Sequence, residues 1–455
     1  MQKKYDWKNN GSQGYPILRG RRNADAVIIG GGLSGLSIAL WLCKAGLRVT
    51  LLEGNTIGSG STASCGGFVS LATSMFYHTL EQKMGQSVTA AYAQTQISAL
   101  GALREIAGEA QKALHWRDTN AWLVAKNARE AQLLSLEADA MKRAGLPCTP
   151  SKEMHCPFPG EDGLLIRDMA TLDAAGYVKY LTKRSEQLGL RIFEKSRVTS
   201  VDTNMVSTQH GSVLAPYVIV ATGYPVVNTP GWYFLRLMQK RSAVLQLETN
   251  APFDGMFFDA NGDYALRRSY GGMALQMNLD RVGMSPNMIV EKEFEMAYAS
   301  YLDGVSIDST ISGIDTYSAD GLPYIGAYSK KTPNLFVATG YGGRGLIGSM
   351  VAAQSISAKI LGLQAEGYSI YEGQREGKKP SRDEVGASLS IAGHYLQGVT
   401  NSKAPRCTHM GCKLVYRPMT CMWECPCHGS RFDDIGHVIS APATQDAQIH
   451  GSKRM

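Results

Sequence analysis

The chain of 455 residues lacks an apolar segment near its start that could serve as a signal peptide. Residues Met1–Asn10 are polar and no hydrophobic run follows them, which predicts a cytoplasmic location. A membrane-spanning run is also missing. The uncharged stretch Ala26–Cys43 reaches 18 residues, near the lower limit of about 17 for a transmembrane helix. Because this stretch contains three consecutive glycines and two serines, we expect no transmembrane segment.

A broad excess of basic residues is absent too, although the formal net charge is +7. Residues 1–23 carry six basic side chains against Asp6, which places +5 on a short N-terminal arm. A basic arm could contact nucleic acid or an anionic membrane, but no aromatic–basic interleaving or basic helix continues it. We interpret it as a solvated arm and expect no nucleic-acid partner. The composition, 44% hydrophobic and 19% charged, is typical of a globular protein with two or three domains.

The stretch Asp25–Glu53 contains a dinucleotide-binding pattern. The apolar run Ala26–Ile29 predicts a buried parallel strand, which leads into glycines at G-x-G-x-x-G spacing and then a helical pattern. A second strand, Arg48–Leu52, ends on Glu53, 23 residues after Gly30. The glycines allow a tight turn, the approach of a pyrophosphate and close helix packing, while the helix N-terminus attracts the phosphates. Since the terminal acid can accept hydrogen bonds from a ribose, the stretch is predicted to bind a dinucleotide.

The segments after this motif suggest two lobes. A small-residue loop at 54–68 can lie against a ligand, and helical patterns follow at Met75–Ala107 and Ala131–Ala144, where they fit a substrate-side lobe. Strand patterns then cover Leu190–Phe193, Ser196–Asp202, Val213–Val220, Ala243–Leu247, Met256–Phe258 and Met273–Met277. We expect the first three to continue the nucleotide-binding lobe and the last three to form a sheet in the other lobe.

Two further motifs carry a family resemblance. One is DGLPYIG at 320–326, and the other is ATGYGGRGL at 338–346, where a strand, a glycine-rich turn and a helix repeat the logic of the first motif. Together with GGGLSG, Glu53, GSGSTASCGG and ATG at 221–223, they resemble the D-amino-acid oxidase/glycine oxidase superfamily of FAD-dependent enzymes over roughly residues 15–368. The resemblance implies an α/β fold, with a glutathione-reductase-like Rossmann lobe for FAD and an α+β substrate lobe. It also implies oxidation of a C–N bond by hydride transfer to flavin N5.

The resemblance places FAD on the glycine motifs and on Val198, whose backbone would meet the adenine. The FAD-binding residues that it implies are Gly30, Gly32, Leu33, Ser34, Gly35, Glu53, Gly60, Ser61, Thr62, Gly66, Gly67, Val198, Ala221, Thr222, Gly223, Gly340, Gly343, Arg344, Gly345 and Leu346. Some relatives tether FAD through a cysteine just upstream of DGLPYIG, but no cysteine lies between Cys156 and Cys407. We therefore expect non-covalent FAD.

The substrate-binding position departs from the family pattern. Glycine and D-amino-acid oxidases have an arginine five residues before the aspartate of DGLPYIG, where it binds the substrate carboxylate, but here that position is Asp315. Either Asp315 is an ordinary polar loop residue, or the pocket prefers a cationic amine to an α-carboxylate. The sequence does not assign the general base. Asp315, Tyr341, Arg344 and His78 are candidates, and an amine that binds deprotonated would need no base.

A cysteine-rich segment lies near the C-terminus. Five of the nine cysteines fall within 407–427, and four of these five lie in the motifs CTHMGC and CPCHGS. They provide two ligand pairs, Cys407 with His409 and Cys425 with His428, separated by 15 residues. Such a set could hold structural zinc, or a Rieske [2Fe–2S] cluster with two thiolates on one iron and two imidazoles on the other. The C-x-H pair is unlike a zinc-finger pair, and the two motifs closely resemble Rieske proteins.

By the same resemblance, Cys412 and Cys427 are the pair that bridges the two cluster loops in high-potential Rieske proteins. Their redox state stays open, since a disulfide is unusual in a reducing cytosol. Cys421 matches no ligand position and is interpreted as structural. Only a short segment, Gly386–Arg406, precedes the first cluster loop. The small all-β Rieske module is therefore expected to be trimmed and to lean on the flavin lobe or on a partner subunit.

These patterns predict four parts of the chain: an N-terminal arm at 1–22, the oxidoreductase at 23–368, a linker at 369–400 and the Rieske module at 401–455. Within the oxidoreductase, we expect the FAD lobe at about 23–85, 165–230 and 311–368. The substrate lobe is expected at about 86–164 and 231–310.

The leading hypothesis is an FAD- and Rieske-dependent oxidoreductase acting on a small amine or amino-acid substrate. Histidine ligands raise the potential of a [2Fe–2S] cluster to about −150 to +300 mV, which suits removal of electrons from a flavin. This favours a dehydrogenase with an external one-electron acceptor, a protein or a quinone, over an O₂-using oxidase. Two alternatives stay open: a reductase in which electrons enter at the cluster, and a non-enzymatic redox carrier or sensor.

Overall fold

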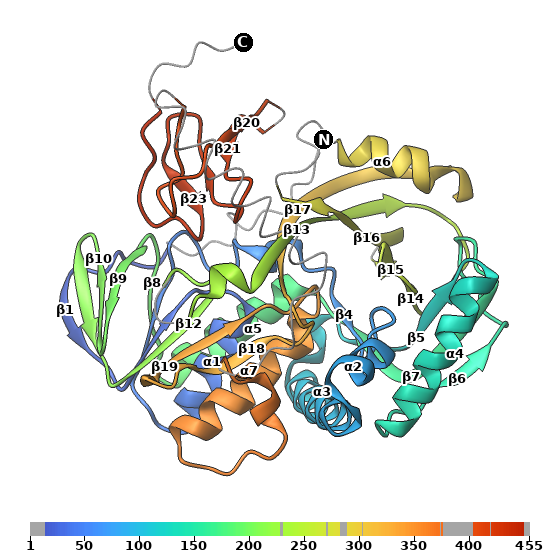
Figure 1. Ribbon diagram of the computed structural model, residues 1–455, viewed down its shortest axis with the longest axis horizontal. Helices are drawn as coiled ribbons and strands as arrows, with labels where there is room; N and C mark the ends of the chain where they lie inside the picture. Colours follow the sequence, from blue (N-terminus) through green and yellow to red (C-terminus); the bar gives the residue numbers. More distant parts are fainter. Residues whose placement is uncertain are drawn as a thin grey trace.

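A computed structural model of the chain describes residues 14–227, 231–269, 272–282, 289–302, 304–373, 375, 404–418 and 420–449. Within these ranges the strands form four sheets. Two of the sheets organise two lobes that lie side by side, and the C-terminal module sits above the first lobe in the view of Figure 1. Among the residues that the structure describes, we find no helix of sufficient length and apolar character to span a membrane.

The first lobe is built on a six-stranded sheet in the order β18-β19-β12-β2-β3-β8, parallel except for the pair β18–β19. Its strands are β2 (Ala26–Ile29), β3 (Val49–Leu52), β8 (Arg191–Phe193), β12 (Tyr217–Gly223), β18 (Tyr324–Ser329) and β19 (Thr332–Thr339). The strand, turn, helix and strand expected at 25–53 are confirmed, because β2 leads through α1 (Leu33–Lys44) to β3. The continuous apolar run of β2 is explained by burial of both faces of a parallel sheet.

Successive side chains of β2 point to opposite faces, so each face has its own core. Ala26 and Ile28 face a core shared with α1, α5 (Ala174–Gln187) and α7 (Gly345–Ile360). Val27 and Ile29 face a second core. A four-stranded sheet closes that second core and consists of β1 (Gly20–Asn23), β11 (Gly211–Leu214), β10 (Met205–Thr208) and β9 (Val198–Asp202).

The second lobe contains a nine-stranded sheet in the order β17-β13-β16-β15-β14-β5-β7-β4, with β6 beside β7. Its strands are β4 (Phe68–Val69), β5 (Arg117–Ala125), β6 (Thr149–Ser151), β7 (Asp162–Thr171), β13 (Leu237–Glu248), β14 (Met256–Asp259), β15 (Tyr264–Ser269), β16 (Gly272–Arg281) and β17 (Ser306–Ser318). The helices of this region are α2 (Tyr77–Met84), α4 (Ala128–Arg143) and α6 (Val290–Ala297). The strand patterns expected for the second lobe are confirmed as parts of β13, β14 and β16.

Two elements expected as single segments are divided. The pattern at Val213–Val220 is split between β11 and β12, which belong to different sheets. Pro216 lies between them, and proline ends a strand because it has no N–H to donate. The helical pattern at Met75–Ala107 is divided at Gly85, which has φ +90° and separates α2 from α3 (Gln86–Leu114).

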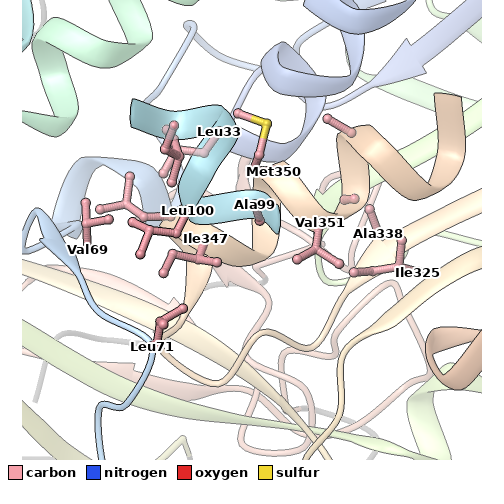
Figure 2. Close-up of a cluster of buried hydrophobic side chains, with 14 of the residues drawn as sticks. Leu33, Val69, Leu71, Ala99, Leu100, Ile325, Ala338, Ile347, Met350 and Val351 are labelled. Atoms are coloured by element: carbon pink, nitrogen blue, oxygen red, sulfur yellow. The ribbon is translucent and has the colours of Figure 1, made fainter. Parts of the chain in front are cut away.

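Helix α3 packs on the first lobe, although residues 86–164 were expected in the substrate lobe. Its apolar stripe, including Ala99 and Leu100, meets Ile347 and Met350 of α7 in the core shown in Figure 2. Conversely, β7 extends the nine-stranded sheet to Thr171, beyond the expected boundary near 165. The boundaries between the two lobes therefore differ from those expected from the sequence.

The ends of the oxidoreductase region also differ from expectation. Part of the expected arm packs on the first lobe, because Leu18 is fully buried and its N–H donates to Ser196 Oγ at 2.9 Å. The start of the expected linker is packed as well, with a 3₁₀ turn at Tyr368–Tyr371 and an ion pair between Arg375 and Asp320. The rest of the linker, 376–400, lies outside the described residues.

The C-terminal module is a small antiparallel sheet, as expected for an all-β module. Its strands are β20 (Val415–Arg417), β21 (Met422–Glu424), β22 (Arg431–Phe432) and β23 (Val438–Ser440). Glu424 of β21 accepts from Arg241 of β13 at 3.0 Å, an ion pair between the module and the oxidoreductase. The module thus rests on the rest of the chain, as its short N-terminal segment suggested.

Candidate active site

The turn between β2 and α1 brings backbone segments into close approach. Gly30 has φ +109°, and a Cβ there would overlap the carbonyl oxygen of Ala221 on β12. A Cβ on Gly35 would overlap the Gly30 carbonyl, so α1 starts directly against the turn. Leu33 N–H donates to Thr62 Oγ1 at 3.1 Å, which ties the small-residue loop to this helix end. The positive end of the α1 dipole therefore faces the loop, as pyrophosphate binding requires.

Glu53 at the end of β3 is held by backbone amides. Its Oε2 accepts from Gly31 N–H at 2.8 Å and its Oε1 from Asn55 N–H at 2.7 Å. Burial raises the pKa of the Glu53 carboxyl, and the two amide hydrogen bonds oppose that shift. The carboxylate is thus fixed at the strand end where a ribose would bind.

A cavity of about 350 Å³ lies at the carboxyl ends of β2, β3 and β12. The expected FAD-binding residues that line it are Gly30, Gly32, Leu33, Ser34, Glu53, Gly60, Ser61, Thr62, Gly66, Gly67, Val198, Ala221, Thr222, Gly223, Gly340, Gly343, Gly345 and Leu346. Its wall also contains a buried carboxamide oxygen, Gln239 Oε1, that has no hydrogen-bond partner among the described residues. Close glycine turns, a helix N-terminus and an unsatisfied polar atom fit a dinucleotide such as FAD.

Asp315 and Tyr341 also lie in the cavity wall. The register of β13 and β17 pairs Ser242 with Gly313, so Ser242 can reach diagonally to Asp315, and its Oγ donates to Asp315 Oδ2 at 2.7 Å. Burial raises the pKa of Asp315, and this hydrogen bond lowers it. Ser34 Oγ donates to Tyr341 Oη at 2.8 Å. Because burial raises the pKa of Tyr341, its hydroxyl stays protonated at neutral pH.

Three expected residues do not line the cavity. Gly35 instead allows α1 to pack on the turn. Arg344 donates to the carbonyl of Gly321 at 2.7 Å, and its guanidinium lies 3.9 Å from the centre of the Phe76 ring. His78 lies in α2, where its backbone N–H donates to Glu137 Oε2 at 2.8 Å. The positions of Arg344 and His78 therefore give no support to a direct role in catalysis.

Other residues complete the wall near Asp315. Cys65 and Phe68 come from the small-residue loop, and Gln276 comes from β16. Arg267 Nε donates to the carbonyl of Gly66 at 2.5 Å and anchors the loop. Burial raises the pKa of Cys65 to about 11, so its thiol is neutral. The loop residues could have been inferred from their place after β3, whereas no local signal marks Gln276.

The two Cys–His motifs meet in the C-terminal module. The Cys407 and Cys425 thiols interact, and the His409 and His428 rings lie 5.1 Å apart between centres. Burial lowers the pKa of His409 to about 4 and that of His428 to about 3, so both imidazoles are neutral and able to bind metal. Neither nitrogen of the His428 ring has a hydrogen bond of normal geometry among the described residues. Two thiols beside two neutral imidazoles fit a Rieske cluster.

Cys412 and Cys427 lie beside this donor set. Their sulfurs are 2.6 Å apart, and with the sulfur of Cys425 they form a group whose members lie within 4.8 Å of one another. That group alone would leave both imidazoles unused, so we favour the predicted Cys₂His₂ set. No disulfide joins Cys412 and Cys427 in the structure, and their pairing stays a prediction. Cys421 is exposed in the turn before β21, apart from these ligands.

One wall of the cavity is shared with the C-terminal module. Tyr224 directly follows β12, lines the cavity and is 2% exposed. Its ring centre lies 5.9 Å from that of His428 and 6.4 Å from that of His409. Gln239 approaches the second cluster loop so closely that a Cβ on Gly429 would overlap its Oε1. The histidine side of the candidate cluster therefore packs against the cavity wall.

Comparison with known proteins agrees with this geometry. A family described as FAD dependent oxidoreductase, DAO, matches residues 25–359. The chain belongs to this family. The Rieske [2Fe-2S] domain matches residues 382–450, which extends into the stretch expected to be a linker. This member of the DAO family is therefore an oxidoreductase with FAD and a Rieske [2Fe–2S] cluster as its cofactors.

Individual relatives match this chain over most of its length. The chain is 24% identical over 481 residues to the putative Rieske 2Fe-2S iron-sulfur protein YhfW of Bacillus subtilis, with 94% of each chain covered. Its fold is similar to glycine oxidase from Geobacillus kaustophilus, with a TM-score of 0.67 and 18% identity over 78% of this chain and 99% of the other. It is also similar to L-proline dehydrogenase from P. horikoshii, with a TM-score of 0.64 and 17% identity over 79% and 98%.

Proposed function

We propose that the protein is a dehydrogenase that oxidises the C–N bond of a small amine or amino acid and releases the electrons through its Rieske cluster. The proposal rests chiefly on Tyr224, which lines the FAD cavity and packs its ring against both candidate histidine ligands of the cluster. A cluster placed there borders the flavin site directly. The final recipient would be an external one-electron acceptor, a protein or a quinone, and the expected compartment is the cytoplasm.

The residues around Asp315 suggest how a substrate is held. Oxidation of an amine to an imine removes two electrons and two protons, for which bound FAD supplies the hydride acceptor and the cluster a one-electron outlet. Asp315 offers a carboxylate oriented by Ser242 to a cationic amine. Phe68 and Gln276 offer an apolar face and a carboxamide beside it. Family members whose pocket binds an α-carboxylate use an arginine at this position, so a substrate with a cationic amine is favoured here.

Anaerobic mixing with a library of small amines and amino acids tests the proposal. A substrate should bleach the flavin absorbance and then produce the Rieske electron-paramagnetic signal. Bleaching with a cluster that stays oxidised would show that electrons do not leave by this route. No bleaching with any amine, together with flavin reduction when electrons are supplied to the cluster, would instead favour the reductase.

Cys425→Ser separates the two steps. With the cluster ligand removed and FAD in excess, substrate should still bleach the flavin, whereas turnover with a one-electron acceptor should collapse. Cys421→Ser is the matched control, because Cys421 is exposed and lies apart from the ligand set. Normal turnover in the Cys425→Ser protein would make the module structural.

A further inference from the structure

The C-terminal module contributes directly to the FAD cavity. Ile439, Ser440, Ala441 and Thr444 line the same cavity as Glu53, Arg197 and Val198. Glu53 and Val198 belong to the end where the ribose and adenine of a dinucleotide are expected. The oxidoreductase lobe therefore forms only part of the wall at this end, and β23 with the turn after it supplies another part.

Ser440 carries an unsatisfied polar atom in this wall. Its hydroxyl oxygen is buried and has no hydrogen-bond partner among the described residues. Buried hydroxyl groups are normally paired, because losing water without a new hydrogen bond is unfavourable. A hydroxyl that is buried, unpaired and part of a ligand cavity is placed to bind a polar group of the ligand.

The segment that carries Ser440 is fixed against the nucleotide end of the cavity. Asn55 Nδ2 donates to the carbonyl of Ile439 at 2.9 Å, and the Arg197 guanidinium donates to the carbonyl of Val438 at 3.1 Å. Asn55 also accepts from the same guanidinium at 3.2 Å. These contacts join the loop after β3 and the turn before β9 to strand β23.

We propose that the Rieske module completes the FAD-binding site and that the Ser440 hydroxyl hydrogen-bonds the adenosine half of FAD. FAD then holds the two parts of the protein together. Because coupling is reciprocal, a change that loosens the docked module must weaken FAD binding, and FAD must stabilise docking. The proposal requires FAD as a cofactor but neither amine oxidation nor a direction of electron flow.

The rate of FAD release from the diluted holoenzyme, followed by flavin fluorescence, tests the role of Ser440. Ser440→Ala should release FAD on the order of five to ten times faster, as expected for one lost hydrogen bond. Ser440→Thr, which keeps a hydroxyl, should stay close to the wild type, and Ser200→Ala on the exposed part of β9 is the matched control. The proposal would be overturned if Ser440→Ala released FAD at the wild-type rate, or if the alanine and threonine variants released it equally fast.

Arg241→Gln tests the coupling without touching the cavity wall. Arg241 pairs with Glu424 across the module boundary and does not line the cavity. Its replacement should accelerate FAD release on the order of fivefold or more, within the usual range of coupling between sites. Arg143→Gln, which breaks the ion pair with Glu81 within the second lobe, should leave release unchanged. An unchanged rate in Arg241→Gln would overturn the coupling, whatever the outcome of the amine experiments.

Discussion

The ring of Tyr224 lies 5.9 Å from the ring of His428, and the same tyrosine lines the FAD cavity. Its backbone is fixed, because Tyr224 N–H donates to the Thr222 carbonyl at 2.9 Å and Thr222 Oγ1 donates to the Tyr224 carbonyl at 2.6 Å. A rigid aromatic side chain thus separates the expected sites of the two cofactors. If electrons pass between those sites, substitution of Tyr224 should change the rate of their transfer.

Replacement of Tyr224 should separate the contribution of the ring from that of the hydroxyl. Tyr224→Phe keeps the ring, so after substrate is added the cluster of this variant should be reduced nearly as fast as that of the wild type. Tyr224→Ala removes the packing against both histidines and should slow the appearance of the Rieske signal on the order of tenfold or more, as for other outer-shell contacts of metal ligands. Rapid freeze-quench spectroscopy measures this rate, with flavin content as the control. Equal rates of cluster reduction in all three proteins would contradict a role of the Tyr224 ring in electron transfer.

Asp315→Asn tests the preference for a cationic amine. The substitution keeps the shape of the side chain but removes its charge, so binding of a cationic substrate should weaken by about 2–5 kcal/mol, on the order of thirtyfold or more. Steady-state KM for the best amine measures the loss. Asp308→Asn is a control on the exposed part of the same strand, β17. Unchanged KM in Asp315→Asn would leave Asp315 as an ordinary polar residue of the wall.

Ser242→Ala should change the pH dependence of the same step. Burial raises the pKa of Asp315, and the hydrogen bond from Ser242 lowers it, so removal of the hydroxyl should raise this pKa further. The ionised carboxylate is the form that binds a cation, so kcat/KM should fall with decreasing pH, and this fall should begin at higher pH in the variant. If kcat/KM began to fall at the same pH in Ser242→Ala as in the wild type, Asp315 would not control this pH dependence.

The same raised pKa has a consequence for stability. Because the folded-state value lies above the unfolded one, the Asp315 carboxyl contributes stability at low pH that is lost as the pH rises through the folded-state pKa.

Heat or acid should release FAD completely from the protein. The prediction follows from the absence of any cysteine between Cys156 and Cys407. After precipitation of the polypeptide, flavin absorbance should be found in the supernatant. Flavin fluorescence that remains with the denatured chain would contradict non-covalent attachment.

The local parts of the fold were predictable because their signals are short-range. The glycine spacing after Ile29 and the acid at Glu53 indicated β2, α1 and β3 correctly, since turn and helix geometry depend on neighbouring residues. The break between β11 and β12 also has a local signal, Pro216. It was missed because the apolar residues on both sides suggested one strand. The packed segment at Tyr368–Tyr371 was harder to predict, because its charged continuation is typical of a linker.

The shared wall of the site could not be inferred from local patterns. Asn55 and Ile439 are separated by 384 positions, and no periodicity predicts that they meet. Tyr224 adjoins the predicted ATG turn, but only the docking of the module brings it to His409 and His428. The cysteine and histidine spacing predicted a set of cluster ligands, whereas the contacts that connect this set to the flavin site depend on tertiary packing.

The last prediction concerns Asp320, the first residue of the DGLPYIG motif. Arg375 binds both carboxylate oxygens of Asp320 at 2.7 Å, with side-chain exposures of 7% and 13%. The guanidinium also donates to the carbonyl of Pro323 at 2.9 Å and lies 3.9 Å from the centre of the Tyr324 ring. The motif is thus tied to the segment that follows the oxidoreductase core.

Arg375→Gln should therefore destabilise the fold by about 3–5 kcal/mol, because it leaves the Asp320 carboxylate buried without its partner. Denaturant unfolding measures the loss, and the double variant with Asp320→Asn should recover part of it, since neither side then carries an uncompensated charge. Arg117→Gln, which breaks an exposed ion pair with Asp254, should leave the midpoint unchanged. If Arg375→Gln also left it unchanged, the segment up to residue 375 would contribute nothing to the stability of the oxidoreductase and would behave as the linker that its composition suggests.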